Sequence, residues 1–239
     1  MKRDSKLFYL FEKNYWEYYL ELENQLLQIK RYVDFDKINF ITYSIEFLKL
    51  FQTICSEIDV VGKMMAHIAN PDFSPEDKQN NIYKWWHEIQ NVYKLTGELE
   101  IDKQDSLKDY KCKFLDEITF YPWKNFEIEK YKDKRGATRY KPTNNFNTPT
   151  WWSDYNKVKH NRITLIDENT KNVNFVKANL GNVCISLSAL YVLEKAFMET
   201  IGTENDLQSF KNFSKIFEKN RRLTRNENRL IKSAIYFRK

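Results

Sequence analysis

The sequence predicts an all-α protein: a helical bundle with one long, irregular insertion over residues 112–150 that holds at most a short β-hairpin. Two observations predict this class. Only five glycines and five prolines occur in 239 residues, so the turn residues that sandwiches and barrels need are scarce. Apolar residues recur at three- and four-residue spacing over long stretches, which is the period of an amphipathic helix. With 42% hydrophobic residues, the chain can bury a sizeable core.

Four segments carry the helical pattern outside the insertion and its neighbourhood. Residues 6–31 have one apolar stripe and open the domain. Residues 39–69 are apolar on more than one side, which is typical of a central helix. Ser74, followed by a proline and acidic residues, predicts the start of a third helix that runs to about Thr96. Residues 174–201 contain a wide apolar stripe, so we expect a second core helix there.

The middle and the end of the chain differ from these segments. Residues 112–150 combine strand-like composition with prolines and a basic, polar loop, which predicts the insertion. A helix is expected to follow it, with Thr148 or Thr150 as its cap. Residues 205–239 form a basic C-terminal extension, and a helix is expected around its phenylalanines, Phe210, Phe213 and Phe217. We interpret residues 1–239 as a single helical domain with this insertion and this extension.

Positive charge is concentrated in two segments. Residues 121–162 carry a net charge of +6 and residues 211–239 a net charge of +8, so the rest of the chain sums to −8. Such segregation is typical of a face that binds a polyanion. A solvated basic surface without a partner is the alternative.

The cysteines and the hydropathy of the sequence indicate the cellular compartment in which we expect the protein. Cys55, Cys112 and Cys184 are widely spaced and include no CxxC pair, which argues against a disulfide framework or a zinc knuckle. Reduced thiols in the cytoplasm fit this pattern best. No uninterrupted apolar stretch approaches 18 residues and the N-terminus lacks a signal-peptide pattern, so we predict neither a membrane span nor secretion.

The stretch "WWSDYNKVKHNR", residues 151–162, is the most informative for function. On an ideal helix its core-facing stripe consists of Trp151, Tyr155, Val158 and Arg162. The opposite side consists of Ser153, Asn156 and His160, with Lys159 at the border. Histidine suits proton transfer near neutral pH, and lysine or arginine suits a phosphate that gains charge, so this side fits phosphodiester chemistry. The alternative is a surface helix whose basic residues complement the dipole at its C-terminus.

Three segments together resemble a known superfamily. They are "SIEFLKLFQTICSEIDVVGKMM", "WWSDYNKVKHNR" and "NFVKANLGNVCISLSALYVL", about half of the chain. They look like an uncharacterised bacterial group within the HEPN (higher eukaryotes and prokaryotes nucleotide-binding) superfamily. The resemblance implies an all-α bundle that forms a homodimer. It further implies a metal-independent endoribonuclease without cofactor, acting in the cytoplasm in bacterial phage defence or a toxin–antitoxin system.

The resemblance also implies roles for individual residues. His160 would be the motif histidine and the general acid and base for attack by a ribose 2′-hydroxyl, with Asn156 as its polar companion. The motif arginine would fall at position 153, 154 or 155, where this chain has Ser, Asp and Tyr. Lys159 and Arg162 would then hold the phosphate, in a variant YNxxKHxR motif.

The missing arginine favours a second reading: a catalytically inactive HEPN-like module that binds RNA or a partner protein. A third reading is a helical scaffold in which the basic cluster only caps a helix. The expected partners are RNA, an antitoxin or defence protein and a second copy of the chain, but no membrane.

Overall fold

The computed structural model describes residues 3–92, 112–114, 118–124, 126–144 and 147–219. Its helices, in chain order, are α1 (Ser5–Phe11), the π-helix η1 (Glu12–Trp16), α2 (Glu17–Ile29), the 3-10 helix η2 (Lys37–Ile41), α3 (Ile45–Ala69), α4 (Ile82–Ile89), α5 (Thr150–His160), the 3-10 helix η4 (Asn174–Lys177), α6 (Leu180–Ile201) and α7 (Glu204–Ser209). Its strands are β1 (Cys112–Phe114), β2 (Ile118–Phe120), β3 (Ile128–Lys132), β4 (Thr138–Pro142), β5 (Leu165–Asp167), β6 (Asn172–Val173) and β7 (Phe217–Lys219).

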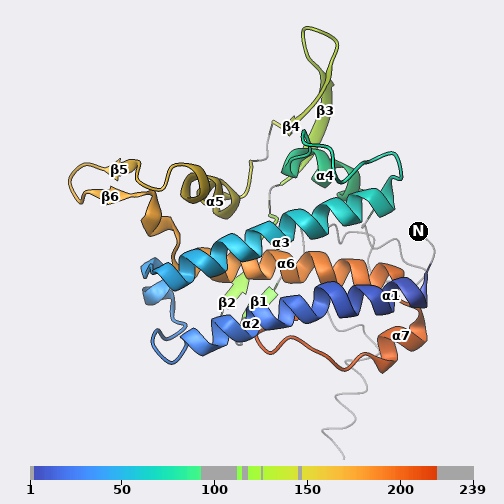
Figure 1. The fold of residues 1–239 in the computed structure, drawn as a ribbon, viewed down its shortest axis with the longest axis horizontal. Helices are drawn as coiled ribbons and strands as arrows, with labels where there is room; N and C mark the ends of the chain where they lie inside the picture. The colour runs from blue at the N-terminus through green and yellow to red at the C-terminus, as the bar shows by residue number, and fades with distance from the viewer. Residues whose placement is uncertain (1–2, 93–111, 115–117, 125, 145–146, 220–239) are drawn as a thin grey trace, which may run out of the picture.

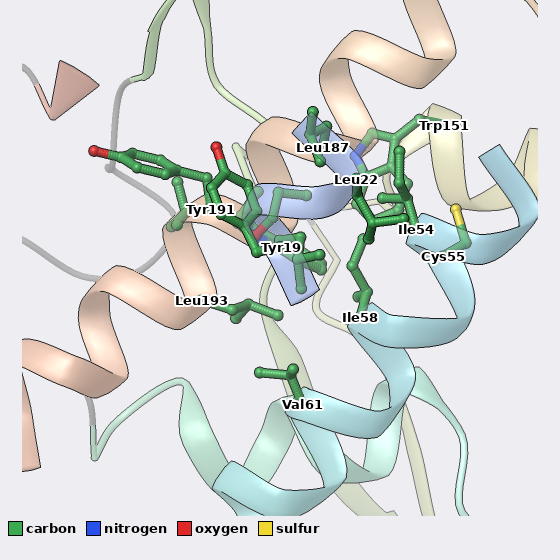
Figure 2. Packing of buried hydrophobic residues seen from close by; sticks show 14 of the residues in the cluster. Tyr19, Leu22, Ile54, Cys55, Ile58, Val61, Trp151, Leu187, Tyr191 and Leu193 are labelled. Atoms are coloured by element: carbon green, nitrogen blue, oxygen red, sulfur yellow. The ribbon is translucent and has the colours of Figure 1, made fainter. Parts of the chain in front are cut away.

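Helices α3 and α6 pack together at the centre of the molecule, and α1–η1–α2 lies along α6 (Figure 1). Figure 2 shows Ile54, Ile58 and Val61 of α3 in the same packed cluster as Leu187 and Leu193 of α6. These side chains are fully buried, which confirms core helices within the predicted ranges 39–69 and 174–201, although α3 begins only at Ile45 and α6 at Leu180. The helix expected over 6–31 is formed by α1, η1 and α2, which bury Phe11, Leu22 and Leu26. The spacing of apolar residues was therefore a sufficient guide to the central layer.

Helix α6 is long and apolar enough to cross a membrane by length and composition. In the fold, 78% of its most apolar stretch is buried against the protein's own helices. This is the environment of a core helix, whose apolar sides are covered by neighbouring elements.

The all-α prediction holds for the helical body but not for the whole fold, because the described residues also form three small antiparallel sheets. The expected hairpin of the insertion is β3–β4, and β5 pairs with β6. In the third sheet, β1 pairs with both β2 and β7, so a strand close to the C-terminal end joins the insertion. Local periodicity cannot predict that sheet because its strands come from distant parts of the chain.

Two predicted helix starts are corrected. The third helix begins at Ile82 rather than after Ser74, because the Asn81 side chain caps it by accepting from the backbone N–H groups of residues 83 and 84. Its expected end at Thr96 lies outside the described residues. Helix α5 has Pro149 at its N-cap and no side-chain cap, whereas the Thr148 hydroxyl is 2.7 Å from that of Tyr83.

The helix expected around Phe210, Phe213 and Phe217 is also corrected. Helix α7 ends at Ser209, and Phe217 begins strand β7. Between them the chain is held along α2 by the buried Glu23, whose carboxylate accepts from the backbone N–H of Lys215 at 2.7 Å. This long-range bond favours an extended segment over the helix that its phenylalanine spacing suggests.

We expect Gly62→Ala to lower the free energy of unfolding by up to about 2 kcal/mol. A Cβ at position 62 would lie 2.7 Å from the fully buried Trp85 ring, and the overpacking, about 1–3 kcal/mol, outweighs the gain of up to about 1 kcal/mol in helix propensity. Urea denaturation measures the change. Gly136→Ala is a contrasting control, because it meets no atom within 4 Å and is strained only through its φ of 77°.

Candidate functional site: a polar cleft between α3, α4 and α5

Helix α5 is fixed to the body by its aromatic side. The Trp151 indole N–H donates to the Pro122 carbonyl at 2.9 Å, and the Tyr155 ring lies edge-on to Phe51 of α3 at 6.0 Å between centroids. Val158 is fully buried. The predicted core stripe is therefore confirmed for Trp151, Tyr155 and Val158, but Arg162 is exposed because the helix ends at His160.

Asp154 of α5 is buried too. Its carboxylate lies 2.8 Å from the Lys177 ammonium and accepts from the Asn182 amide at 3.3 Å. A weaker pair with Lys157 spans 3.6 Å. Asp154 thus ties α5 to η4 and α6, a structural use that we did not predict.

A cleft of about 370 Å³ lies between α3, the start of α4 and the polar side of α5. Its lining residues are Ser56, Asp59, Asn80, Asn81, Ile82, Tyr83, Thr148, Trp152, Ser153, Tyr155, Asn156 and Lys159. Aromatic rings, side-chain amides and one cation therefore face a shared space. This combination suits a ligand that has both a flat ring and a negative charge.

The cation of the lining is Lys159, whose ammonium lies 5.4 Å from the centre of the Tyr155 ring. Lys159 forms no ion pair with any described residue, whereas the cleft's carboxylate, Asp59, pairs with Lys63 and accepts from the Trp85 indole at 3.0 Å. The charge available to a ligand is thus positive. Burial raises the pKa of Tyr155 to about 12, so its phenol stays neutral at physiological pH.

One acceptor in the lining has no partner. The Oδ1 atom of Asn80 is buried and accepts no hydrogen bond from the described residues, although the amide nitrogen donates to the Ser74 carbonyl. A buried acceptor without a donor is costly, and because this oxygen has almost no surface open to the cleft, it is not available to a ligand in this conformation.

The four predicted site residues do not assemble into one constellation. Asn156 and Lys159 line the cleft, whereas His160 and Arg162 do not. His160 is exposed at the last position of α5, and no hydrogen bond joins it to the other three in the described chain. The Arg162 guanidinium donates from Nε to the Val158 carbonyl at 3.2 Å, so it closes the helix end rather than facing His160.

Most of the cleft was missed by the sequence analysis. Asn80 and Asn81 come from the turn before α4, Tyr83 from its first turn, and Ser56 and Asp59 from α3. Residues from separate segments meet only through tertiary packing, which helical spacing within α5 does not encode. The adjacent amides at 80 and 81, just before an aromatic helix, were the one local signal.

Fold and cleft together define a mostly helical protein with small antiparallel sheets and a polar, cationic cleft between three helices. No family model, curated protein or solved structure matches this chain. In the described part of the chain, no three His, Cys, Asp or Glu side chains form a group that could hold a metal ion.

Proposed function

We propose that this chain is a HEPN-like RNA-binding protein whose cleft holds one unstacked nucleotide. The observation that carries the proposal is the lining itself, in which aromatic rings, amides and an unpaired lysine surround about 370 Å³. RNA-binding sites commonly stack single-stranded bases on aromatic side chains and hydrogen-bond their edges. Lys159 supplies a charge for the phosphate, and the exposed Asn156 supplies a side-chain amide for the base edge.

The setting of the proposal rests on the resemblance to HEPN proteins. It comprises a homodimer in the bacterial cytoplasm, in phage defence or a toxin–antitoxin system, with RNA and an antitoxin or defence protein as partners. The net positive charge of residues 121–162, which include α5, supports a polyanionic ligand at this side of the molecule.

Lys159→Ala is expected to weaken binding of a single-stranded RNA oligonucleotide about three- to tenfold, and to reduce the slope of log K against log salt by about 0.7. Fluorescence anisotropy at several salt concentrations measures both quantities. Lys157→Ala is the matched control, because it removes the same charge from the same helix outside the cleft. Equal losses in the two variants would show that only net charge matters and would contradict the cleft as the binding site.

A second candidate function is metal-independent RNA cleavage, and the exposed His160 favours it. Its imidazole has no hydrogen-bond partner among the described residues, so it is free to accept the proton of a ribose 2′-hydroxyl. The 2′-oxygen would bond to phosphorus, the 5′-oxygen would leave and take up a proton, and a cyclic phosphate would remain. In the described chain, only the Nε of Arg162 is engaged by a carbonyl, so the cation that such a reaction needs would come from Arg162, from Lys159 or from a second copy of the chain.

Cleavage of RNA in EDTA that is lost in His160→Ala, while binding is retained, would support this candidate. If the wild-type protein binds RNA but does not cleave it, the RNA-binding function remains and the nuclease candidate is rejected. A wild-type protein that binds no RNA at low salt would overturn both candidates.

A further inference from the structure

The β3–β4 hairpin forms an arm that projects from the helical body beyond α4 (Figure 1). Its strands pair from Ile128↔Pro142 to Lys132↔Thr138. The base is fixed to α4, because the Gln90 side chain exchanges two hydrogen bonds with the backbone of Ile128, at 2.7 and 2.9 Å. The arm therefore has a defined position, although most of its residues are exposed.

The tip of the arm is a tight, polar turn. Gly136 has a φ of 77°, and its N–H donates to the Asp133 carbonyl at 2.9 Å. The Asp133 carboxylate accepts from the backbone N–H groups of Arg135 and Ala137. The turn thereby holds Lys134 and Arg135 at the outermost point of the arm.

Charge is distributed unequally between the two faces of the arm. Alternation along a strand puts Glu129, Arg139 and Lys141 on one face, and there Lys141 pairs with Glu129 at 3.0 Å. Arg139 is also neutralised, because its Nε lies 3.1 Å from Asp133. We call Arg139 and Lys141 the paired cations.

The other face and the tip carry cations of a different kind. These are Lys130, Lys132, Lys134 and Arg135, which we call the free cations. All four are exposed, and none forms an ion pair with a described residue, although Lys132 donates to the Thr138 hydroxyl at 2.8 Å. Four like charges on a two-stranded ribbon repel one another, and a polyanionic partner would relieve that repulsion.

The chemistry of the arm favours the phosphates of a nucleic-acid duplex over other anionic partners. A membrane-binding element needs an apolar face, whereas the tip between Asp133 and Ala137 has none. Protein interfaces are depleted of lysine at their centres. A duplex carries one negative charge per about 1.7 Å of its axis, so a rigid ribbon can meet several phosphates at once.

Helix α4 connects the arm with the cleft. Its first residues, Ile82 and Tyr83, line the cleft, whereas His87 contacts the Tyr140 ring of the arm at 5.2 Å between centroids. The helix has eight residues and is therefore about 12 Å long. A strand that leaves a duplex on the arm would have only a short distance to the cleft.

We propose that the β3–β4 arm binds the phosphate backbone of a duplex through its free cations, so that the preferred ligand is a nucleic acid with a duplex segment next to a single-stranded one. The inference extends the proposed function to a second surface. Because duplex binding needs no cleft, it can be tested separately.

The test compares two double variants that remove the same charge from the same arm. Lys130→Ala/Lys134→Ala removes free cations, and Arg139→Ala/Lys141→Ala removes paired ones. Both are titrated against a blunt RNA duplex and a DNA duplex of the same sequence by fluorescence anisotropy at several salt concentrations. We expect the first variant to bind duplex about tenfold more weakly, with a salt slope smaller by about 2, and the second to bind within about threefold of wild type.

Equal losses on both duplexes would support recognition of phosphates alone, and a loss confined to RNA would support recognition of A-form geometry. Equal losses in the two variants, or a wild type that binds anionic phosphatidylserine vesicles but no duplex, would overturn the inference. Single-stranded RNA with Lys159→Ala reports on the cleft separately. If the protein binds duplex but no single-stranded RNA, the inference about the arm stands and the proposed function of the cleft is rejected. If it binds single-stranded RNA but no duplex, the cleft proposal stands and the inference about the arm is rejected.

Discussion

Replacement of Glu23 by alanine is expected to lower the free energy of unfolding by about 3–5 kcal/mol and to release residues 210–217 from the helical body. The Glu23 side chain is fully buried on α2. Its carboxylate accepts from the Tyr19 hydroxyl at 2.8 Å, from the Ser214 hydroxyl and from the backbone N–H of Lys215. Alanine would remove this acceptor from the Ser214 hydroxyl and the Lys215 N–H, and it would leave the buried Tyr19 hydroxyl with only the Ser214 Oγ, 3.0 Å away, among the described residues.

Urea denaturation measures the loss, and hydrogen exchange at the Lys215 and Ile216 amides reports on the segment itself. Glu21→Ala is the matched control, because Glu21 is exposed on the same helix and its carboxylate accepts from the exposed Gln25 side chain. We expect the control to change stability by no more than about 0.5 kcal/mol. A Glu23→Ala protein that keeps both amides protected would contradict the anchoring role.

The C-terminal segment illustrates where sequence reasoning was sufficient and where it was not. Spacing identified the helices of the central layer because each buries a stripe that its own sequence determines. The phenylalanines at 210, 213 and 217 have helical spacing as well, yet only the first and last are buried, on an extended segment. The deciding contact is Glu23, almost 200 positions away in sequence. Local patterns carry no information about such a partner.

The candidate site, too, could be predicted from the sequence only where it lies within one helix. Helical geometry correctly separated the core side of α5, with Trp151 and Val158, from its polar side. Asn156 lies in the cleft as that arithmetic suggests, but His160 is one turn further on, at the helix end, and outside the cleft lining. The other wall depends on how α4 and α5 both pack on α3, which no single segment reveals. The Asn80 acceptor could therefore be found only from the structure.

A second large effect is expected in the opposite direction: Glu194→Met should raise the free energy of unfolding at pH 7 by about 2–3 kcal/mol. Glu194 lies on the core helix α6 and is fully buried, and neither carboxyl oxygen has a hydrogen-bond partner among the described residues. Methionine has a similar length and no polar atom to desolvate, and its flexible side chain adapts to the space. Differential scanning calorimetry and urea denaturation both measure the gain.

The stabilisation should depend on pH. Burial, followed by the nearby Glu57 carboxylate, raises the pKa of Glu194 well above its ordinary value, so the folded protein keeps this carboxyl protonated where the unfolded chain ionises it. Above about pH 4.3 the unfolded state therefore binds fewer protons than the folded state. Each further pH unit lowers the free energy of unfolding by up to about 1.4 kcal/mol, until the pH reaches the pKa of Glu194 in the folded protein. The wild type should lose stability relative to Glu194→Gln between pH 4 and pH 7. Replacing the half-buried neighbour by Glu57→Gln should change the pH dependence of stability only slightly. If stability falls with pH in parallel for wild type and Glu194→Gln, Glu194 is ionised in the folded protein and the prediction is wrong.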